Sequence, residues 1–152
     1  MCPCCDSVQE GKRVALKVIR NEKRFLVQGN IEVQILGELN SGGAGKAHNC
    51  VSMLESFKFR GHLCITFDLH SHDLYTELKA RDFVGFSMAD VRGVMADVLK
   101  SLVLLKQKKI VHADLKPENI LLAGETGADV KVIDFGSSCF EHGRVHTYVQ
   151  SR

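Results

Sequence analysis

The sequence HADLKPENILL, residues 112–122, places the polar residues Asp114, Lys116 and Asn119 at intervals of two and three, directly before an apolar run. A second apolar stretch also ends in polar residues, in VIDFGSS at 132–138. A surface loop needs polar residues, but it does not need these three at this spacing. The chemistry that requires such a set is phosphoryl transfer from ATP.

Each polar residue matches one requirement of that reaction. A carboxylate must orient the attacking hydroxyl and accept its proton, which is the role expected of Asp114. A nearby cation such as Lys116 neutralises charge on the transferred phosphoryl group. Hard oxygen ligands must hold Mg²⁺ against the phosphates, and Asn119 and Asp134 supply an amide carbonyl and a carboxylate. The apolar run 120–122 anchors the loop in the core and so preorganises these groups.

Composition and length are typical of one globular domain. The chain has 152 residues, 45% hydrophobic and 25% charged residues, and a net charge of +2. A domain of this length buries roughly 70% of its unfolded surface, and so small a charge indicates neither a nucleic acid nor an anionic membrane as partner. No apolar run approaches the ~20 residues of a membrane span, and the N-terminus lacks the apolar core of a signal peptide. Nothing in the sequence indicates secretion.

The six cysteines are unevenly spaced, at positions 2, 4, 5, 50, 64 and 139. Zinc sites usually have two spaced pairs, and CPCC at the start has no convincing second pair; HNC at 48–50 is a poor candidate. Free thiols in a reducing compartment are the expectation, with a metal site as the alternative. We therefore expect the protein in the cytoplasm or the nucleus.

Three segments of the first half are typical of β-strands. RVALKVIR (13–20) is rich in β-branched residues and places Ala15 and Lys17 on the same face. Two more strands are expected at about 51–59 and 63–69, joined through Arg-Gly-His. These segments predict an antiparallel sheet near the N-terminus.

A helix is expected over 27–39, where apolar residues recur at steps of three and four. Gly29 and Asn30 weaken this pattern, and a glycine-rich turn ends it. That turn, NSGGAGKAH at 40–48, superficially resembles a phosphate-binding loop, but Asn40 and Ala47 stand where the motif requires Gly and Ser or Thr. A flexible turn is the expectation there.

The clearest helix begins after Ser87, a good N-cap with Asp90 three residues on. Its apolar residues form one continuous stripe: Val91, Val94, Met95, Val98, Leu99, Leu102 and Leu105. Its C-terminal end is basic, which suits the helix dipole, at Lys106, Lys108 and Lys109. Short strands are expected at 120–122 and 130–133, forming a hairpin with polar residues at both ends.

Three segments, in this order, resemble signatures of the eukaryotic protein kinase fold: VALKVI (14–19), HADLKPEN (112–119) and DFG (134–136). More narrowly, VIRNEKRF (18–25), DFGSSCFEHGRV (134–145) and TYVQSR (147–152) resemble the dual-specificity tyrosine-regulated kinases, the DYRK group. This resemblance implies an α+β, kinase-like but partial fold, with part of the N-lobe sheet, helix C, the hinge and the start of the helical C-lobe. Residues 14–69 would be the N-lobe part and hinge, and 70–152 the C-lobe part up to the activation loop; 1–13 stay unassigned.

The resemblance also implies a role for each matching residue. Lys17 would contact the α- and β-phosphates of ATP, with Glu32 as its ion-pair partner; a solvated helix acid is the alternative for Glu32. Ala15 and Leu121 would enclose the adenine from opposite sides. The other residues expected at the nucleotide site are the gatekeeper Phe67, the hinge residues Asp68, Leu69 and His70, and Glu118. An apolar spine joining the lobes would contain Leu36, His112 and Phe135, for which simple core packing is the alternative.

Ala113 stands where most protein kinases have an arginine that binds an activation-loop phosphate. The DYRK group has a small residue there and uses a phosphorylated activation-loop tyrosine, which Tyr148 matches; Arg152 would pair with that phosphate. An ordinary surface tyrosine is the alternative for Tyr148.

The glycine-rich loop G-x-G-x-x-G is missing before Lys17, so the two strands that cover the phosphates are expected to be absent. The sequence also stops at Arg152, before the end of the activation segment. We therefore expect a partial kinase domain that leaves apolar surface of the helix over 91–105 uncovered. Two functions stay open: a kinase that uses ATP and Mg²⁺ to phosphorylate Ser/Thr of protein substrates and a tyrosine of its own, and a catalytically silent remnant that only binds proteins.

Overall fold

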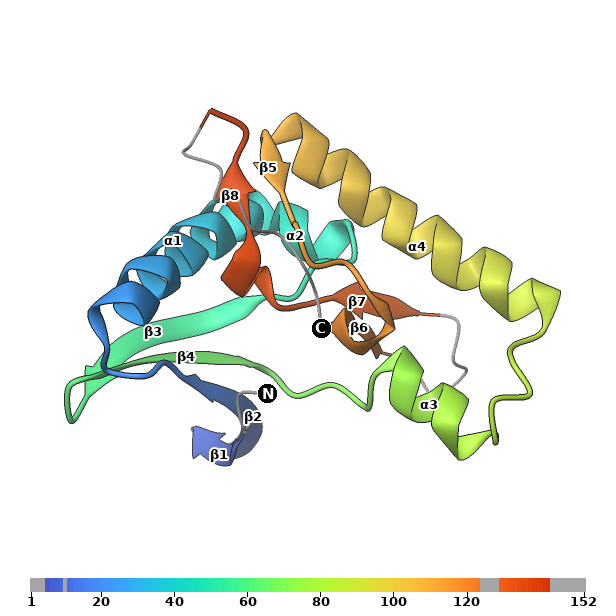
Figure 1. The fold of residues 1–152 in the computed structure, drawn as a ribbon, viewed down its shortest axis with the longest axis horizontal. Coiled ribbons are helices and arrows are strands. Elements are labelled where there is room, and N and C mark those ends of the chain that lie inside the picture. The colour runs from blue at the N-terminus through green and yellow to red at the C-terminus, as the bar shows by residue number, and fades with distance from the viewer. Residues whose placement is uncertain (1–4, 10, 124–128, 143–152) are drawn as a thin grey trace.

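The structure is a computed structural model and describes residues 5–9, 11–123 and 129–142. A four-stranded antiparallel sheet has the order β1-β2-β4-β3 (Figure 1). Its strands are β1 (Cys5–Gln9), β2 (Lys12–Val18), β3 (Met53–Phe59) and β4 (His62–Asp68). The three strands predicted near the N-terminus are confirmed, except that β4 ends at Asp68 rather than at Leu69.

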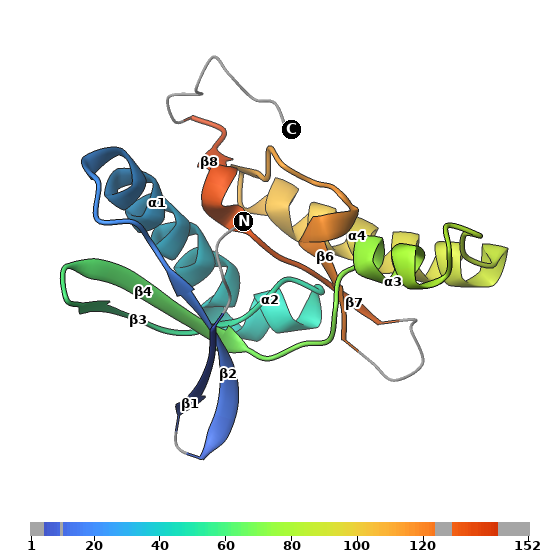
Figure 2. The same cartoon turned by 60° about the horizontal axis from the view of Figure 1, so that its bottom comes forward.

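Strand β1 lies in the segment 1–13, which the sequence leaves unassigned, and it corrects the expectation that the two strands before Lys17 are absent. Its five residues pair with β2 from Cys5↔Leu16 to Gln9↔Lys12, and the hairpin projects away from the helices (Figure 2). The sequence CDSVQ has neither strict alternation nor a run of β-branched residues, so the periodicity used to predict the other strands was missing here.

The hairpin between β3 and β4 turns at Arg60 and Gly61, whose φ angles are 47° and 82°. Positive φ at both central residues is what a two-residue type I′ turn requires, and its twist matches that of the flanking strands. The turn fixes the register Phe59↔His62. Pairing with β2 places Phe67 opposite Ala15, and a register shift between Met53 and Glu55 places it opposite Met53 on β3.

Helix α1 (Lys23–Asn40) packs on one face of this sheet, and Ile35, Leu36 and Leu39 are fully buried there. The helix predicted from Val27 is confirmed and begins four residues earlier. Gly29, which weakens the pattern in the sequence, permits the close approach of helix and sheet, because a Cβ there would lie 3.1 Å from a Leu63 methyl and 3.3 Å from Ile19.

Helix α4 (Met88–Gln107) begins as predicted, since Ser87 Oγ accepts a hydrogen bond of 3.1 Å from the Asp90 N–H. Its apolar stripe is not one face, which corrects the prediction. Val98, Leu104 and Leu105 are buried, whereas a second set on the far side is exposed: Met88, Val91, Met95, Leu99, Leu102 and Val103. The uncovered apolar surface expected on this helix is therefore present.

The remaining elements are short. They are η1 (Ser41–Gly43), α2 (Ala44–Ala47), α3 (Leu74–Ala80), β5 (Ile110–Val111), η2 (Pro117–Asn119), β6 (Ile120–Leu122), β7 (Val130–Val132), η3 (Phe135–Ser137) and β8 (Cys139–Phe140). The hairpin β6–β7 confirms the two short strands predicted from the sequence. The flexible turn expected at 40–48 is wrong, because η1 and α2 occupy most of it.

One large apolar cluster lies between the sheet, α1 and the C-terminal elements and includes Leu36, Ile65, Val132 and Phe135. A smaller cluster joins α3, α4, β6 and β7 around Val98 and Val130. Among the residues that the structure describes, no helix is both long and apolar enough to cross a membrane.

Candidate active site

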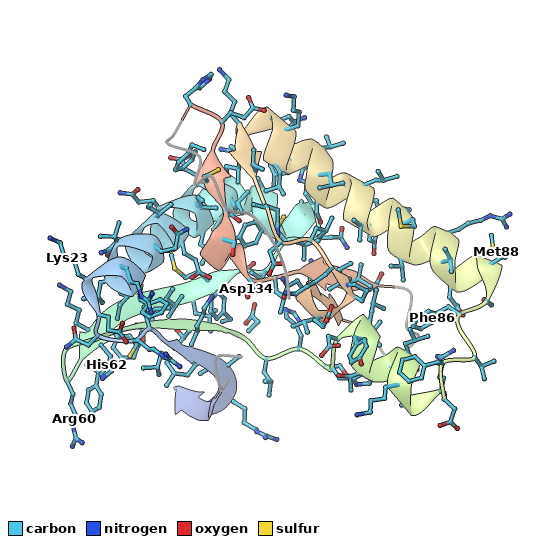
Figure 3. The ribbon with its side chains drawn as sticks, in the orientation of Figure 1. Lys23, Arg60, His62, Phe86, Met88 and Asp134 are labelled. Carbon is cyan, nitrogen blue, oxygen red and sulfur yellow. The ribbon has the colours of Figure 1, made fainter. Side chains whose placement is uncertain are left out.

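Lys17 is shared by two carboxylates from distant parts of the chain. Its Nζ lies 2.7 Å from Glu32 Oε1 on α1 and 2.7 Å from Asp134 Oδ1 after β7. Strand β2 presents Lys17 on the face that it shares with Ala15, opposite Ile65 of β4. Asp134 lies near the middle of the molecule (Figure 3). The structure thus brings together three of the residues that the sequence analysis assigned to ATP binding.

Burial and charge act in opposite directions on this cluster. Burial alone would lower the pKa of Lys17, but Glu32 and Asp134 outweigh it and hold the pKa above its ordinary value. Burial would raise the pKa of Asp134, yet the attraction of Lys17 holds it below its usual range. The Glu32 side chain is 2% exposed, and burial raises the pKa of its carboxyl. Lys17, divided between two carboxylates, offsets this rise only in part. Near neutral pH the lysine is charged.

Asp134 has a left-handed backbone conformation, with φ 60° and ψ 77°. This conformation is uncommon outside glycine but is tolerated by aspartate. The Gly136 N–H donates to Asp134 Oδ1 at 3.3 Å. A Cβ at Gly136 would lie 3.0 Å from that oxygen and 3.2 Å from Lys17 Nζ. Glycine is therefore required here by the close approach of the two charged groups.

The loop between β5 and β6 gathers the other polar residues of the motif. Lys116 Nζ lies 2.9 Å from Asp114 Oδ2, and Asn119 Nδ2 donates to the Asp114 carbonyl at 2.7 Å and to its Oδ2 at 3.1 Å. The spacing of two and three in the sequence therefore folds the lysine and the asparagine around one carboxylate. Since the side-chain nitrogen of Asn119 faces Asp114, the side-chain oxygen Oδ1 is left for another partner.

Backbone pairing connects this loop to Asp134. The register Ile120↔Val132 continues in a hydrogen bond of 3.0 Å from the Ile133 N–H to the Asn119 carbonyl. The metal ligands predicted from the sequence, Asn119 and Asp134, therefore lie at the same end of this hairpin, Asn119 directly before β6 and Asp134 two residues after β7. Glu118 precedes Asn119 in η2. An amide carbonyl and a carboxylate are oxygen ligands that suit Mg²⁺.

His112 fixes the start of the loop. Its Nε2 bonds the Ile133 carbonyl at 3.0 Å, its Nδ1 accepts from the Asp114 N–H at 3.3 Å, and its ring centroid lies 5.0 Å from that of Phe135. Burial lowers the pKa of His112, which keeps the ring neutral. Ala113 between these residues has φ 64°, a strained conformation for alanine.

A family model for the protein kinase domain matches residues 2–152 of the chain. The chain belongs to the protein kinase family. It is 49% identical over 148 residues to human "Dual specificity tyrosine-phosphorylation-regulated kinase 4". This match covers 97% of the chain and 28% of the human protein. It is 49% identical to the Drosophila melanogaster kinase 2 of the same name (91% of the chain, 19% of the relative) and 50% identical to human kinase 3 (91% and 24%). The chain thus spans about a quarter or less of the length of these relatives.

The residues expected around the adenine of a kinase lie on two sheets. Ala15 and the half-buried Phe67 are paired on the large sheet, and Leu121 is half-buried on β6. Asp68 ends β4, and Leu69 and His70 lead on to the bridge between Asp73 and Leu121. The hinge segment therefore connects the two sheets directly. Burial lowers the pKa of His70, so this ring is neutral at pH 7.

Several predicted features lie outside the described residues. Tyr148 and Arg152 are among them, as are Cys2 and Cys4. Within the part of the chain that the structure describes, no three His, Cys, Asp or Glu residues are grouped to hold a metal. Cys50, Cys64 and Cys139 are free thiols, and burial raises the pKa of Cys50 to about 11.

Sequence reasoning missed Ser138, which lies two residues after the Asp-Phe-Gly segment of this chain. Its side chain is buried and its Oγ donates to the His112 carbonyl at 2.9 Å. Gln28 of α1 also donates to the Ser138 carbonyl, at 3.3 Å. These bonds tie the segment after Asp134 to both halves of the site. Two consecutive serines after the glycine were the available signal.

Proposed function

We propose that this chain carries the catalytic centre of a protein kinase that transfers the γ-phosphoryl group of ATP to Ser/Thr of proteins. The observation that supports it most is the 2.7 Å contact of Lys17 Nζ with both Glu32 and Asp134. The half-buried ammonium lies beside one carboxylate that would be an oxygen ligand for Mg²⁺, while a second carboxylate fixes the lysine in position. A merely structural ion pair would need only one of the two carboxylates.

The chain's own residues divide the work of the reaction. Lys17 binds the phosphates, and Glu32 holds its Nζ in place. Asp114 orients the acceptor hydroxyl and takes its proton, while Lys116, 2.9 Å away, offsets the negative charge that gathers there. Asn119 and Asp134 would hold Mg²⁺, which neutralises charge on the phosphates when it is bound with ATP. The hairpin β6–β7 keeps the two ligands in a fixed relation.

The test is transfer of labelled phosphate from ATP to Ser/Thr peptides by the longest gene product that contains residues 1–152. We expect transfer by the wild type and a loss of at least a hundredfold with Asp114→Asn. Asp82→Asn is the matched control, since Asp82 is exposed with φ 49°, where asparagine is tolerated. A folded wild type without transfer would instead support the catalytically silent, protein-binding alternative.

We further propose autophosphorylation of Tyr148. The names of the relatives, "dual specificity tyrosine-phosphorylation-regulated", support it, together with the neighbouring Arg152, which could pair with the phosphate. The test is mass spectrometry of the same longest gene product, made in bacteria. It should find the phosphate on Tyr148 in the wild type and not in Asp114→Asn. Unmodified Tyr148 in a preparation with full Ser/Thr activity would contradict this proposal.

For the location we propose the cytoplasm or the nucleus. The free thiols of Cys50, Cys64 and Cys139 support a reducing compartment. Fluorescence microscopy of the tagged gene product tests it. Signal confined to the secretory pathway would contradict it.

A further inference from the structure

A buried polar cluster lies on the side of β7 opposite β6, away from the charged groups of the candidate site. Its members are the half-buried Asn49 in the segment between α2 and β3, and the buried Asp97 and Ser101 on α4. Ser101 is fully buried and Asp97 is 6% exposed. The two stand one helical turn apart and interrupt the buried apolar face of α4. Buried polar groups of this kind are costly unless they are hydrogen-bonded.

Each of these side chains binds a backbone group outside its own element. Ser101 Oγ lies 2.9 Å from the His48 carbonyl and 3.1 Å from the Asn49 carbonyl, to which it can donate. Asn49 Nδ2 donates to the Val130 carbonyl at 3.0 Å, and Asp97 Oδ2 accepts from the Val130 N–H at 3.3 Å. Side chains therefore bind both the N–H and the carbonyl of Val130, the first residue of β7.

The backbone of the same segment continues the contact along β7. The Val132 N–H donates to the Asn49 carbonyl at 2.8 Å, and the Val51 N–H donates to the Val132 carbonyl at 2.9 Å. Asn49 has φ 60°, which turns the chain into this pairing. The segment leads back through α2 to α1, which carries Glu32, while β7 leads forward to Asp134 two residues later.

We propose that Asn49 and Ser101 are positioning residues that set the place of Asp134 relative to Lys17 and Glu32. They do so by clamping β7 to the segment that follows α1 and α2, with α4 as the support (Figure 1). This inference deepens the proposed function, because Asp134 is the expected Mg²⁺ ligand. Its geometric part concerns only the distance between Lys17 and Asp134 and does not depend on turnover.

The test is an NMR measurement on the 152-residue chain. A Cβ at Gly136 would lie 3.2 Å from Lys17 Nζ, so the α-protons of Gly136 should show a cross-relaxation signal (NOE) with the ε-protons of Lys17. In Ser101→Ala we expect this signal to fall at least twofold while the signals between β2 and β4 stay unchanged. Ser87→Ala removes the same group from the other end of α4 and should leave the signal intact.

A second pair of variants keeps the test decisive if Ser101→Ala fails to fold. Asn49→Asp places a carboxylate oxygen against the Val130 carbonyl and should weaken the same signal at least twofold. Asn30→Asp is its control, since exposed Asn30 also donates to a backbone carbonyl, that of Leu26 at 2.8 Å. Unchanged Lys17–Gly136 signals in folded Ser101→Ala or Asn49→Asp would overturn the proposal. If the Lys17–Gly136 signal falls in these variants but the wild type transfers no phosphate, the positioning role stands. That result would count against the proposed kinase function alone.

Discussion

Lys17 and Asp134 are 117 positions apart in the sequence, and their Nζ and Oδ1 atoms lie 2.7 Å from each other. Glu32 approaches the same ammonium from α1 at the same distance. Strand, helix and the turn after β7 thus meet at one charged group. The expected chemistry and part of the stability of the chain both depend on this contact.

Lys17→Met should destabilise the chain more at pH 7 than at pH 5. Without the ammonium, burial acts unopposed on Glu32 and raises the pKa of that carboxyl further above its unfolded value. A carboxyl with the higher pKa in the folded state takes up a proton on folding, so stability rises as the pH falls through this pKa. We expect a loss of about 3 kcal/mol at pH 7 and a smaller loss at pH 5, measured by urea unfolding.

Lys23→Met is the control for this experiment, because Lys23 is exposed at the start of α1. It should change the free energy of unfolding by less than about 0.5 kcal/mol at either pH. Equal losses for Lys17→Met at both pH values would show that the pair is not buried as described.

Gly136→Ala and Gly37→Ala should change stability in opposite directions. A Cβ at Gly136 would lie 3.0 Å from Asp134 Oδ1, whereas at Gly37, inside α1, it would meet nothing within 4 Å. Overpacking at Gly136 should cost about 1–3 kcal/mol, and the better helix former at Gly37 should add up to about 1 kcal/mol. Thermal unfolding measures both, and a neutral Gly136→Ala would contradict the close approach of Lys17 and Asp134.

The exposed apolar residues of α4 should make the isolated chain self-associate. Met95 is 49% and Leu99 54% exposed on the side of α4 away from the core, and apolar surface of this kind promotes association. The double substitution of both residues by lysine should lower the apparent mass in light scattering without lowering the melting temperature. Gln34→Lys on exposed α1 surface adds charge elsewhere and should have no such effect; equal solubilisation by it would refute the role of the α4 surface.

Asp114→Asn and Asp134→Asn should separate turnover from nucleotide binding in the longest gene product with these residues. Asp114 is bonded to Lys116 and Asn119 rather than placed as a phosphate ligand, so its substitution should leave ATP affinity within about twofold. Asp134→Asn removes charge from the proposed Mg²⁺ ligand, which is also a partner of Lys17, so it should weaken Mg²⁺-dependent binding as well. Calorimetry measures both affinities, and normal affinity in Asp134→Asn would contradict its assignment.

The hairpin β6–β7 and the start of α4 could be predicted because local signals decide them. Ser87 accepts a hydrogen bond from the Asp90 N–H, as its position before the apolar pattern indicated. Lys116 and Asn119 both contact Asp114, as their spacing in the sequence suggested. Such signals act over a few residues and are visible in the sequence.

Long-range features could not be predicted in this way. Gly29 disfavours a helix locally, yet it lets α1 approach Leu63. Asp97 and Ser101 look like interruptions of an apolar helix face until β7 and the segment at Asn49 are placed against them. The division of the α4 stripe into buried and exposed residues likewise depends on tertiary packing, which overrides periodicity.

The most direct test of the account follows the Lys17 ε-proton signals of the 152-residue chain by NMR during titration with Mg²⁺-ATP and, separately, with adenosine. We predict a saturable shift of the Lys17 signals with Mg²⁺-ATP and a much smaller one with adenosine, which lacks the phosphates that Lys17 should bind. The affinity of the 152-residue chain should be weak, since its residues 1–16 contain no G-x-G-x-x-G motif to supply backbone N–H groups to the phosphates. Lys17 signals that stay unmoved at millimolar Mg²⁺-ATP, or that move equally with adenosine, would contradict the assignment of this site to ATP.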